Sequence, residues 1–487
     1  MSPDRRTFLK TAGAAAASLL TPPRIFAQTA ADYTLTIATK PLEIAPKRIL
    51  SVTTYNGQFP GPLLRFKEGQ PVTIDIHNDT DIPEQLHWHG QFVSPDVDGA
   101  AEEGTPFIPP HGSRRISFTP KPAGFRFYHT HVRARANLDL GQYGGLVGPV
   151  YIEPKDHPGN YDHEVFLTLK EFQPTLSRGG DMPQHFLSPA QPVAELKDSG
   201  ESQMKASLAR GLPHGFEVGY DAFTINGRML GHGDPVRVKS GERVLFHVFN
   251  ASATEIRSLA LPGHTFTVIA MDGNPLPKPV RVPVLWLGTA ERLSAIVEMN
   301  HPGVWIMGDL DDDDRHRGMG IVVEYAGSKS KPQWQPPAPF KWNYAHFGNP
   351  AATANAPAPD ETFTMLFEKQ NAALDGFNQW TINGVAYPLN QMMAADPAFH
   401  LREGKRYRIR MRNASDDIHP VHLHRHTFEL TKYAGHPTSG LKKDIVMVGG
   451  YQEVEIDFEA NNPGATLFHC HQQLHMDHGF MTLFTYT

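Results

Sequence analysis

Three copies of one β-rich unit run along this chain, and they constrain its fold more than any other feature. Each copy contains an alternating strand with one apolar face, closed by an asparagine and a turn residue. These strands span residues 72–78, 244–250 and 407–413. The copies lie ~160 residues apart, which is the size of a domain. Because 42 prolines and 42 glycines favour turn-rich β structure over long helices, we predict an all-β chain of three consecutive β-sandwich domains.

The sequence also suggests where these domains begin and end. We expect them at residues 31–156, 159–327 and 358–487. Residues 328–357, which precede the third domain, are rich in Pro, Ala and Asn and have the composition of a linker.

The first 27 residues contain the three parts of an export signal. Residues 4–10 read Asp-Arg-Arg-Thr-Phe-Leu-Lys, a twin-arginine pattern, and a weakly apolar stretch follows from residue 12 to residue 20. A small-residue cleavage site ends at Ala27. A disordered basic tail is the alternative, but a tail would not need all three parts. We therefore expect residues 1–27 to be a twin-arginine signal peptide of a bacterial or archaeal protein that is periplasmic or secreted.

The charge and the hydropathy of the rest of the chain exclude two classes of partner. The formal net charge is −6 at pH 7, and the expected signal carries four basic side chains against one acidic one, so the remainder carries −9. A mildly acidic surface does not favour a nucleic-acid partner. No run after the signal approaches the ~20 apolar residues that cross a bilayer, so no membrane span is expected.

The chain has a single cysteine, Cys470, which stands between His469 and His471. A lone thiol cannot form an intrachain disulfide, although an exported protein meets an oxidising compartment where most cysteines pair. A thiol flanked by imidazoles instead predicts a metal ligand, and cysteine with histidines is the donor set of an electron-transfer copper.

Six further histidines strengthen this interpretation, because together with His469 and His471 they form four His-x-His pairs. The pairs are His87 with His89, His129 with His131, His422 with His424, and His469 with His471. On a strand, residues i and i+2 point to the same face, so each pair presents two imidazoles together. Cys470 faces the other way, and His419 stands an odd number of residues before His422, so both can serve a second site behind the first. Eight histidines suit a multinuclear copper cluster, whereas a zinc site needs only four ligands.

The ends of the three copies differ in their ligands. The first copy has Thr130 where the third has Cys470, and the middle copy reads Ile-Met-Gly-Asp at residues 306–309 where the third reads Phe-His-Cys-His. We therefore expect the first and third copies to hold metal and the middle copy to be a spacer.

The four motifs resemble those of three-domain multicopper oxidases, the laccase and copper-efflux-oxidase group, over essentially the whole mature chain. The resemblance implies cupredoxin-like Greek-key domains and four copper ions: one type 1, one type 2 and a type 3 pair. It also implies that O2 is reduced to water at a trinuclear cluster in the seam between domains one and three, with electrons from a small-molecule donor. One chain is sufficient for such a site, so a monomer suffices.

The same resemblance assigns the ligands by position. His419, Cys470 and His475 would bind the type 1 copper, and His87 and His422 the type 2 copper. The type 3 pair would be bound by His89, His129 and His471 on one side and by His131, His424 and His469 on the other.

Two positions depart from the family pattern. Arg425 stands where the family usually has a glycine after the third histidine of the His-Pro-x-His-Leu-His run. The resemblance places the type 1 axial position ten residues past the cysteine, on Phe480, which cannot coordinate as a methionine would. The alternative is Met481 next to it, which a one-residue bulge could bring into that position. Losing that donor should raise the potential of the copper.

Reduction of O2 to water consumes protons, so the mechanism needs an acid near the cluster. Asp98, nine residues after His89, matches the proton-relay aspartate of the family. Asp477, within the last motif, is a second and weaker candidate.

Three functions fit these residues. The leading hypothesis is a laccase-like oxidase of phenolic or aromatic-amine donors. A metallo-oxidase acting on Cu(I) or Mn(II) for metal tolerance is the alternative, although the 15 methionines are scattered rather than gathered in a soft copper-binding insertion. A non-catalytic copper-binding protein or an envelope scaffold is the third hypothesis, and the complete ligand set argues against the scaffold.

Overall fold

The computed structural model describes residues 30–155, 159–178, 186–187, 191–349, 357–388 and 399–487. Within these ranges most of the regular structure is β-strand, which confirms the expected all-β class. The expected signal peptide, residues 1–27, lies outside the described residues, as do residues 350–356 of the expected linker. Among the described helices, none is long and apolar enough to cross a membrane.

The N-terminal part of the chain folds into two sheets of four strands. In spatial order the first contains β2 (Arg48–Tyr55), β1 (Tyr33–Ala45), β4 (Val72–Asn78) and β6 (Ser113–Phe118). The second contains β3 (Leu64–Lys67), β8 (Val147–Glu153), β7 (Gly124–His129) and β5 (His87–His89). One buried apolar cluster, with Ile74 from the first sheet and Trp88 and Ile152 from the second, joins them into a β-sandwich.

The middle part has one large sheet and two small ones. The large sheet runs β10 (Glu217–Ile225), β9 (His163–Ser177), β12 (Arg243–Asn250), β17 (Arg292–Glu298), β14 (Phe266–Met271) and β15 (Asn274–Val282). The small sheets are β11 (Val236–Val238), β19 (Gly320–Tyr325) and β18 (Val304–Gly308), and the pair β13 (Arg257–Leu259) and β16 (Leu285–Leu287).

The C-terminal part again has two sheets. The first runs β21 (Phe377–Ile382), β20 (Glu361–Leu374), β23 (Arg406–Asn413), β28 (Glu453–Glu459), β25 (Phe428–Tyr433) and β26 (His436–Lys443). The second runs β22 (Phe399–Leu401), β30 (Met481–Tyr486), β29 (Thr466–Cys470), β24 (His419–Leu423) and β27 (Ile445–Val448).

The same local structure recurs in all three parts, because the repeated asparagine has the same partners each time. Asn78, Asn250 and Asn413 are fully buried, and each side-chain oxygen accepts from the backbone N–H two residues later, at 3.0, 3.0 and 2.9 Å. Each of the strands that these residues close, β4, β12 and β23, pairs in parallel with the first long strand of its own unit. The asparagine therefore fixes the turn that leads from each of these strands into the following loop.

Within the described ranges the helical elements are short, with one exception. They are α2 (Pro95–Asp98), α3 (Ala194–Ala209), α4 (Asp312–His316), α5 (Gln473–Asp477), and the 3-10 turns η1 (Ala101–Glu103), η2 (Gly141–Tyr143) and η3 (Tyr344–Phe347). The exception is α3, which packs against β20 of the C-terminal part. Gly200 allows this close approach, since a Cβ there would come within 1.9 Å of the Ala414 carbonyl oxygen.

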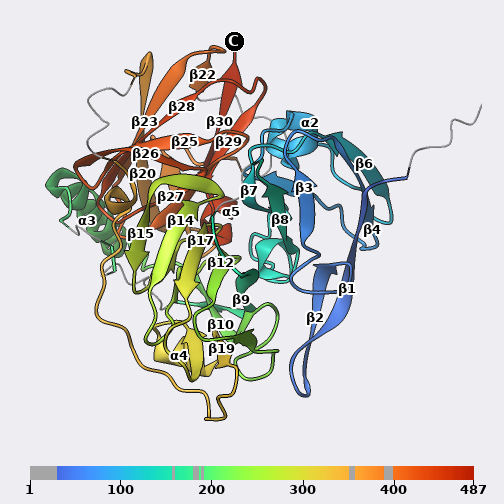
Figure 1. The fold of residues 1–487 in the computed structure, drawn as a ribbon. Helices are drawn as coiled ribbons and strands as arrows, with labels where there is room; N and C mark the ends of the chain where they lie inside the picture. Colours follow the sequence, from blue (N-terminus) through green and yellow to red (C-terminus); the bar gives the residue numbers. More distant parts are fainter. Residues whose placement is uncertain (1–29, 156–158, 179–185, 188–190, 350–356, 389–398) are drawn as a thin grey trace, which may run out of the picture.

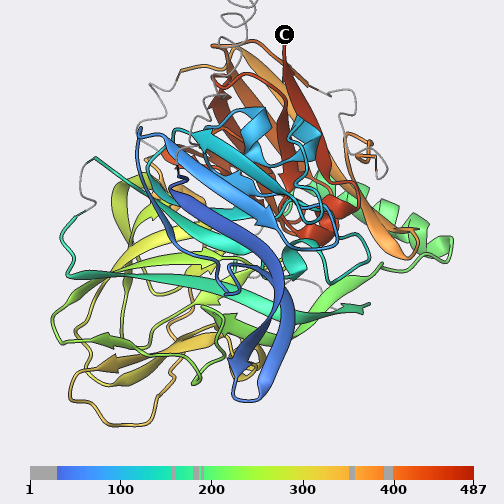
Figure 2. The ribbon, with the colours of Figure 1, turned by 90° about the vertical axis from the view of Figure 1, so that its right-hand side faces the viewer.

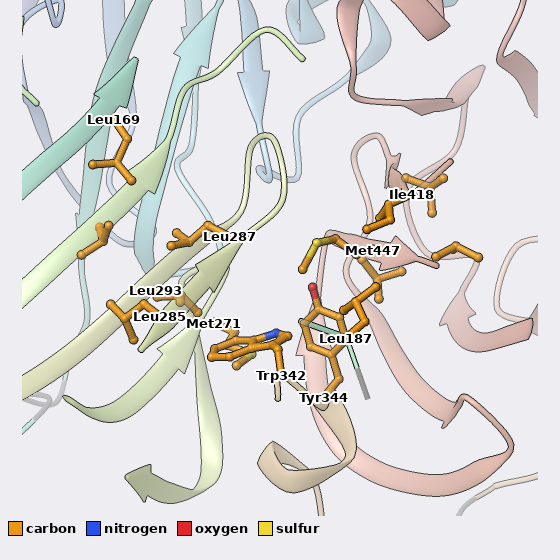
Figure 3. Packing of buried hydrophobic residues seen from close by; sticks show 14 of the residues in the cluster. Leu169, Leu187, Met271, Leu285, Leu287, Leu293, Trp342, Tyr344, Ile418 and Met447 are labelled. Atoms are coloured by element: carbon orange, nitrogen blue, oxygen red, sulfur yellow. The ribbon is translucent and has the colours of Figure 1, made fainter. Parts of the chain in front are cut away.

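Three aromatic residues near the end of the described part of the expected linker are packed rather than free. Trp342, Tyr344 and Phe347 have no exposed surface. Figure 3 shows Trp342 beside Met271 and Leu285 of the middle part, and Tyr344 below Met447 of the C-terminal part, within one apolar cluster. The segment thus attaches the middle part to the C-terminal part.

The three parts share a common centre. Figure 1 shows the N-terminal sandwich (blue) beside the C-terminal sheets (orange and red), with the middle sheets (green and yellow) below, and β7 and α5 lie near the centre. In the turned view of Figure 2 the blue strands cross in front of the red ones. The Leu467 N–H donates to Glu103 Oε1 across this seam at 2.7 Å, so the first and third parts are in direct contact.

Candidate metal centre

Two pairs of neighbouring strands hold the histidine pairs. In the first part β5 pairs with β7, so that His87 lies opposite His129. In the third part β24 pairs with β29, so that His422 lies opposite His469. Because residues i and i+2 share a face of a strand, each pair of strands presents four imidazoles on one side, and all eight rings are buried.

The structure brings the eight rings together across the seam in mixed groups. Within each group the candidate ligand atoms lie within 4.8 Å of one another. The groups are His89 with His129 and His471, His131 with His424 and His469, and His87 with His89 and His422. Each therefore contains histidines from both the first and the third part of the chain, as a site at their seam requires.

The hydrogen bonds of these rings leave one nitrogen of most of them without a protein partner. Among the described residues, the buried atoms without a partner include His87 Nε2, His89 Nδ1, His129 Nε2, His131 Nε2, His422 Nε2 and His471 Nε2. A buried polar atom without a partner costs free energy, so several in one place need an explanation. A metal ion is such an explanation, because a neutral imidazole offers a metal the nitrogen that carries no proton.

Backbone carbonyl oxygens hold three of the other ring nitrogens. His129 Nδ1 donates to Thr130 O at 2.7 Å, His469 Nδ1 to Cys470 O at 2.8 Å, and His87 Nδ1 to Asp98 O at 2.8 Å. Burial lowers the pKa of His89, His129, His131, His422, His424, His469 and His471. The lowered pKa keeps these seven rings neutral, which is the form that binds metal.

A second site lies on the other face of β29. Cys470 Sγ is 3.8 Å from His419 Nδ1 and 3.6 Å from His475 Nδ1, and the two nitrogens are 3.1 Å apart. All three residues are buried. His419 Nε2 bonds to Ser415 Oγ at 2.8 Å, and the Trp380 indole stacks on the His475 ring with centroids 3.9 Å apart. Two imidazole nitrogens and one sulfur converge here, the donor set of a blue copper site.

Phe480 rather than Met481 faces this second site. The Phe480 ring lies 4.7 Å from the His419 ring, and it belongs to the same apolar cluster as Cys470. Met481 lies opposite His469 in the β29–β30 pair and packs in a separate cluster that includes Leu467. No bulge swings Met481 into the axial position, since the register between β29 and β30 is regular from Thr466 to His469.

Asp98 lies between two of the histidine groups. Its Oδ2 is 2.9 Å from His424 Nδ1 and 3.0 Å from His87 Nδ1, and the carboxylate is fully buried. These are the positions that the sequence assigns to a type 3 and the type 2 copper. An acid that contacts both can orient both rings and exchange a proton close to them.

Asp477, the second predicted acid, has different partners. It accepts hydrogen bonds from the backbone N–H groups of Ala134 and Arg135 at 2.9 and 2.6 Å, and from Gln473 Nε2 at 2.9 Å. Burial raises the pKa of Asp477 to about 7. These contacts attach the last motif to the first part of the chain.

Sequence reasoning missed three acids beside the histidines. Glu103 Oε1 is 3.5 Å from His424 Nδ1, Glu102 Oε2 is 3.7 Å from His131 Nδ1, and Asp444 Oδ1 is 3.2 Å from His89 Nε2. Glu102 and Glu103 follow Asp98 closely in the sequence, and that proximity was the available signal. Asp444 is more than 300 residues from His89, and nothing in its local sequence indicates this contact.

The unusual Arg425 has a left-handed backbone, with φ of 57°, and a fully buried guanidinium. This group donates to the carbonyl oxygens of Ala465 at 2.6 Å, Pro463 at 2.7 Å and Val93 at 2.9 Å. It also lies 3.9 Å from Glu103 Oε2. The arginine thus adopts a left-handed backbone, which glycine tolerates more readily, and ties the first part of the chain to the third.

Comparison with known proteins agrees with this geometry. Three family models, each described as multicopper oxidase, match residues 36–157, 195–324 and 356–487. The chain therefore belongs to the multicopper oxidase family. Members of this family bind copper and are oxidoreductases with O2 as acceptor. The three units are accordingly cupredoxin-like, as expected.

Among its relatives, the chain is similar to the multicopper oxidase MmcO of Mycobacterium tuberculosis, with 29% identity over 90% of this chain and 84% of that protein. It is also similar to Laccase-4 of Thanatephorus cucumeris, with 26% identity over 86% of this chain and 83% of that protein. A multi-copper oxidase structure from Pseudomonas thermotolerans superposes with a TM-score of 0.68 and 23% identity, covering 94% of this chain and all of that one. The last likeness concerns the fold alone.

Proposed function

We propose that this protein is a laccase-like oxidase. It couples four one-electron oxidations of a phenolic or aromatic-amine donor at a type 1 copper to reduction of O2 to water at a trinuclear cluster. One observation carries the proposal: Cys470 has two imidazole nitrogens 3.6 and 3.8 Å from its sulfur, and the residues on either side of it, His469 and His471, belong to two histidine groups at the seam.

The ligand assignment follows the family resemblance, and the groups in which the candidate ligand atoms converge support it. His419, Cys470 and His475 are assigned to the type 1 copper, His87 and His422 to the type 2 copper, and the remaining six histidines to the type 3 pair in the two groups given above. Copper bound at these atoms would accept single electrons beside Cys470 and supply the O2-reducing centre among the eight imidazoles.

The chain itself connects the two sites by a short route. Cys470 is bonded through the backbone to His469 and His471, and the His469 ring donates to the Cys470 carbonyl oxygen at 2.8 Å. The distance that an electron has to cross is therefore fixed by covalent bonds and one hydrogen bond. Asp98, in contact with His87 and His424, is the assigned proton donor, and Asp477 is the weaker candidate.

The charges near the Cys470 site favour an organic donor over a metal cation. Asp416 and Asp417 lie close to His419 in sequence, and a carboxylate pair of this kind could attract a hard cation such as Mn(II). The Lys369 ammonium is paired with both, at 3.1 Å from Asp417 Oδ2, and only 6% of its side chain is exposed. Because the Lys369 ammonium already lies between the two carboxylates, they attract a metal-ion substrate less strongly.

Oxygen uptake by the copper-loaded protein tests the function, with a phenol and with Cu(I) as donors in parallel. We expect faster uptake with the phenol and none above background in Cys470→Ser. Faster turnover of Cu(I) than of every phenol would make the protein a metallo-oxidase. Copper binding without oxygen uptake from any donor would support the non-catalytic alternative.

Three further assignments belong to the same proposal. We infer domains at residues 31–156, 159–327 and 358–487 joined by the segment 328–357, an active monomer, and export by the twin-arginine route to the periplasm or the medium. The N-terminal sequence of the mature protein checks the export: it should begin at Gln28, and an intact residue 1 in the exported fraction would contradict it.

A further inference from the structure

A cluster of fully buried charges lies where the three parts of the chain meet. It draws on β7 of the first part, on the middle part, and on the end of β26 with the residue after it. Its members are Arg126, Asp272, Glu291, Arg292, Lys443 and Asp444, each at most 1% exposed. Buried charges are costly unless they are paired, so the positions of the partners decide what this cluster can do.

Asp444 is the member held most firmly. Arg292 binds it through two parallel hydrogen bonds, with Nη1 2.7 Å from Oδ1 and Nη2 2.6 Å from Oδ2. Arg126 Nη1 adds a third contact at 3.2 Å from Oδ2. A bidentate guanidinium fixes both the position and the plane of a carboxylate, which an ammonium cannot do.

The same aspartate contacts two of the predicted copper ligands. Its Oδ1 is 3.2 Å from His89 Nε2, and its backbone oxygen accepts from His422 Nδ1 at 2.6 Å. These contacts leave His89 Nδ1 and His422 Nε2 as the buried nitrogens without a partner. The neighbouring rings of His87 and His129 are held through Nδ1 instead, so His89 presents the opposite nitrogen, and Asp444 is the group that determines this.

We propose that Arg292, which comes from the middle part and is not itself a ligand, is a positioning residue of the metal centre. It holds the Asp444 carboxylate so that His89 carries its proton on Nε2 and directs Nδ1 toward the metal. This inference rests on the proposed copper site. It also gives the middle part a second task besides spacing the two outer parts.

The chain offers a matched control in Arg257. This arginine also lies in the middle part, is 1% exposed, and is paired with buried carboxylates, with Nη2 3.7 Å from Glu171 Oε2 and Nη1 on Asp314. Its carboxylate partners are not those that contact the histidines of the metal centre. Arg257→Lys therefore reproduces the loss of a buried guanidinium without disturbing Asp444.

The test compares copper-loaded Arg292→Lys with Arg257→Lys and with the wild type. Copper per chain is measured, together with the ratio of the near-ultraviolet absorption of the type 3 pair to the blue absorption of the Cys470 site. We expect Arg292→Lys to lose at least one copper per chain and at least half of this ratio, while Arg257→Lys retains both. Equal values in the two variants would overturn the proposal.

Two features of the experiment keep the result interpretable. The blue absorption reports folded molecules with an intact third part, so a low yield of Arg292→Lys does not alter the ratio. Asp444→Asn, which removes the charge but keeps the size of the side chain, should lower the same ratio, and an unchanged ratio would also overturn the proposal. A wild type that binds no copper would instead refute the proposed function, so the two failures are distinguishable.

Discussion

Thr130 and Cys470 occupy the same place in the first and third parts of the chain. The Thr130 N–H donates to Leu146 O at 3.0 Å, and the Cys470 N–H donates to Phe480 O at 3.1 Å. Each residue stands between two histidines that face the shared centre. The Thr130 hydroxyl donates to Glu84 Oε2 at 3.0 Å, and Glu84 precedes His87 by three residues, as His419 precedes His422. A glutamate and a threonine thus replace a histidine and the thiol, and the first part has no soft donor at this place.

Cys470→Ser removes the only thiolate and leaves the eight imidazoles untouched. We expect the blue absorption to disappear, copper to fall from four to three per chain, and oxygen uptake to fall to background. A serine hydroxyl is nearly the same size, so the melting temperature of the copper-free protein should change little. Copper analysis and absorption on one sample check this, and a retained blue colour would contradict the ligand assignment.

Glu84→Gln should change how stability depends on pH. Burial raises the pKa of Glu84 from 4.5 to about 7, so the folded protein binds a proton that the unfolded chain releases. Proton uptake by Glu84 on folding adds to the free energy of unfolding of the wild type. This contribution is present in full below pH 4.5, and it is lost as the pH rises through 7. The neutral glutamine has no such loss, so the variant should gain about 2 kcal/mol relative to the wild type between pH 5 and pH 8.

Denaturant unfolding of both proteins in the same copper state, at pH 5 and at pH 8, measures this difference. Tyr143→Phe is a suitable control, because Tyr143 lines the same surface groove as Glu84 but its pKa lies well above 10. The difference in unfolding free energy between this control and the wild type should be the same at pH 5 and at pH 8. If the difference for Glu84→Gln is also the same at both pH values, Glu84 is ionised in the folded protein at pH 5 and at pH 8.

Phe480→Met should lower the potential of the type 1 copper. The Phe480 ring lies 4.7 Å from the His419 ring, and a methionine in its place would bring a thioether toward the copper as an axial donor. We expect a fall on the order of 60 mV, a tenfold change in a one-electron equilibrium. Redox titration of the blue absorption measures it, with Phe480→Leu as the control that adds no donor; equal potentials in the two variants would contradict the axial assignment.

Arg425→Gly should destabilise the protein although glycine tolerates a left-handed backbone better. The substitution relieves strain at φ of 57° but leaves the carbonyl oxygens of Val93, Pro463 and Ala465 without their donor. The loss should outweigh the gain, by about 2–4 kcal/mol of unfolding free energy. Lys47→Gly, at an exposed residue with φ of 66°, is the control and should change stability by less than about 0.5 kcal/mol. A more stable Arg425→Gly would mean that the guanidinium contacts contribute nothing.

Much of the fold could be predicted because its signals are local. The alternating strands that end at Asn78, Asn250 and Asn413 revealed the threefold repeat, since burial on one face of a strand has a period of two residues. The spacing of His87 and His89 predicted rings on a common face for the same reason. The arrangement of these rings in mixed groups is a long-range property, and it followed from the family resemblance rather than from the spacing.

Other features could not be predicted because their signals are not local. Helix α3 has no clear apolar face, burying only Leu196 and Ser207, so its sequence did not indicate a helix. The aromatic side chains of Trp342 and Tyr344 are buried only because two other parts of the chain enclose them. Asp444 contacts His89 through a junction that no single segment encodes.

The most direct measurement is X-ray diffraction at the copper absorption edge from crystals of the copper-loaded protein. We expect four anomalous peaks in each molecule: three among the eight imidazoles at the seam and one beside Cys470, His419 and His475. A single peak among the imidazoles, or none beside Cys470, would contradict it.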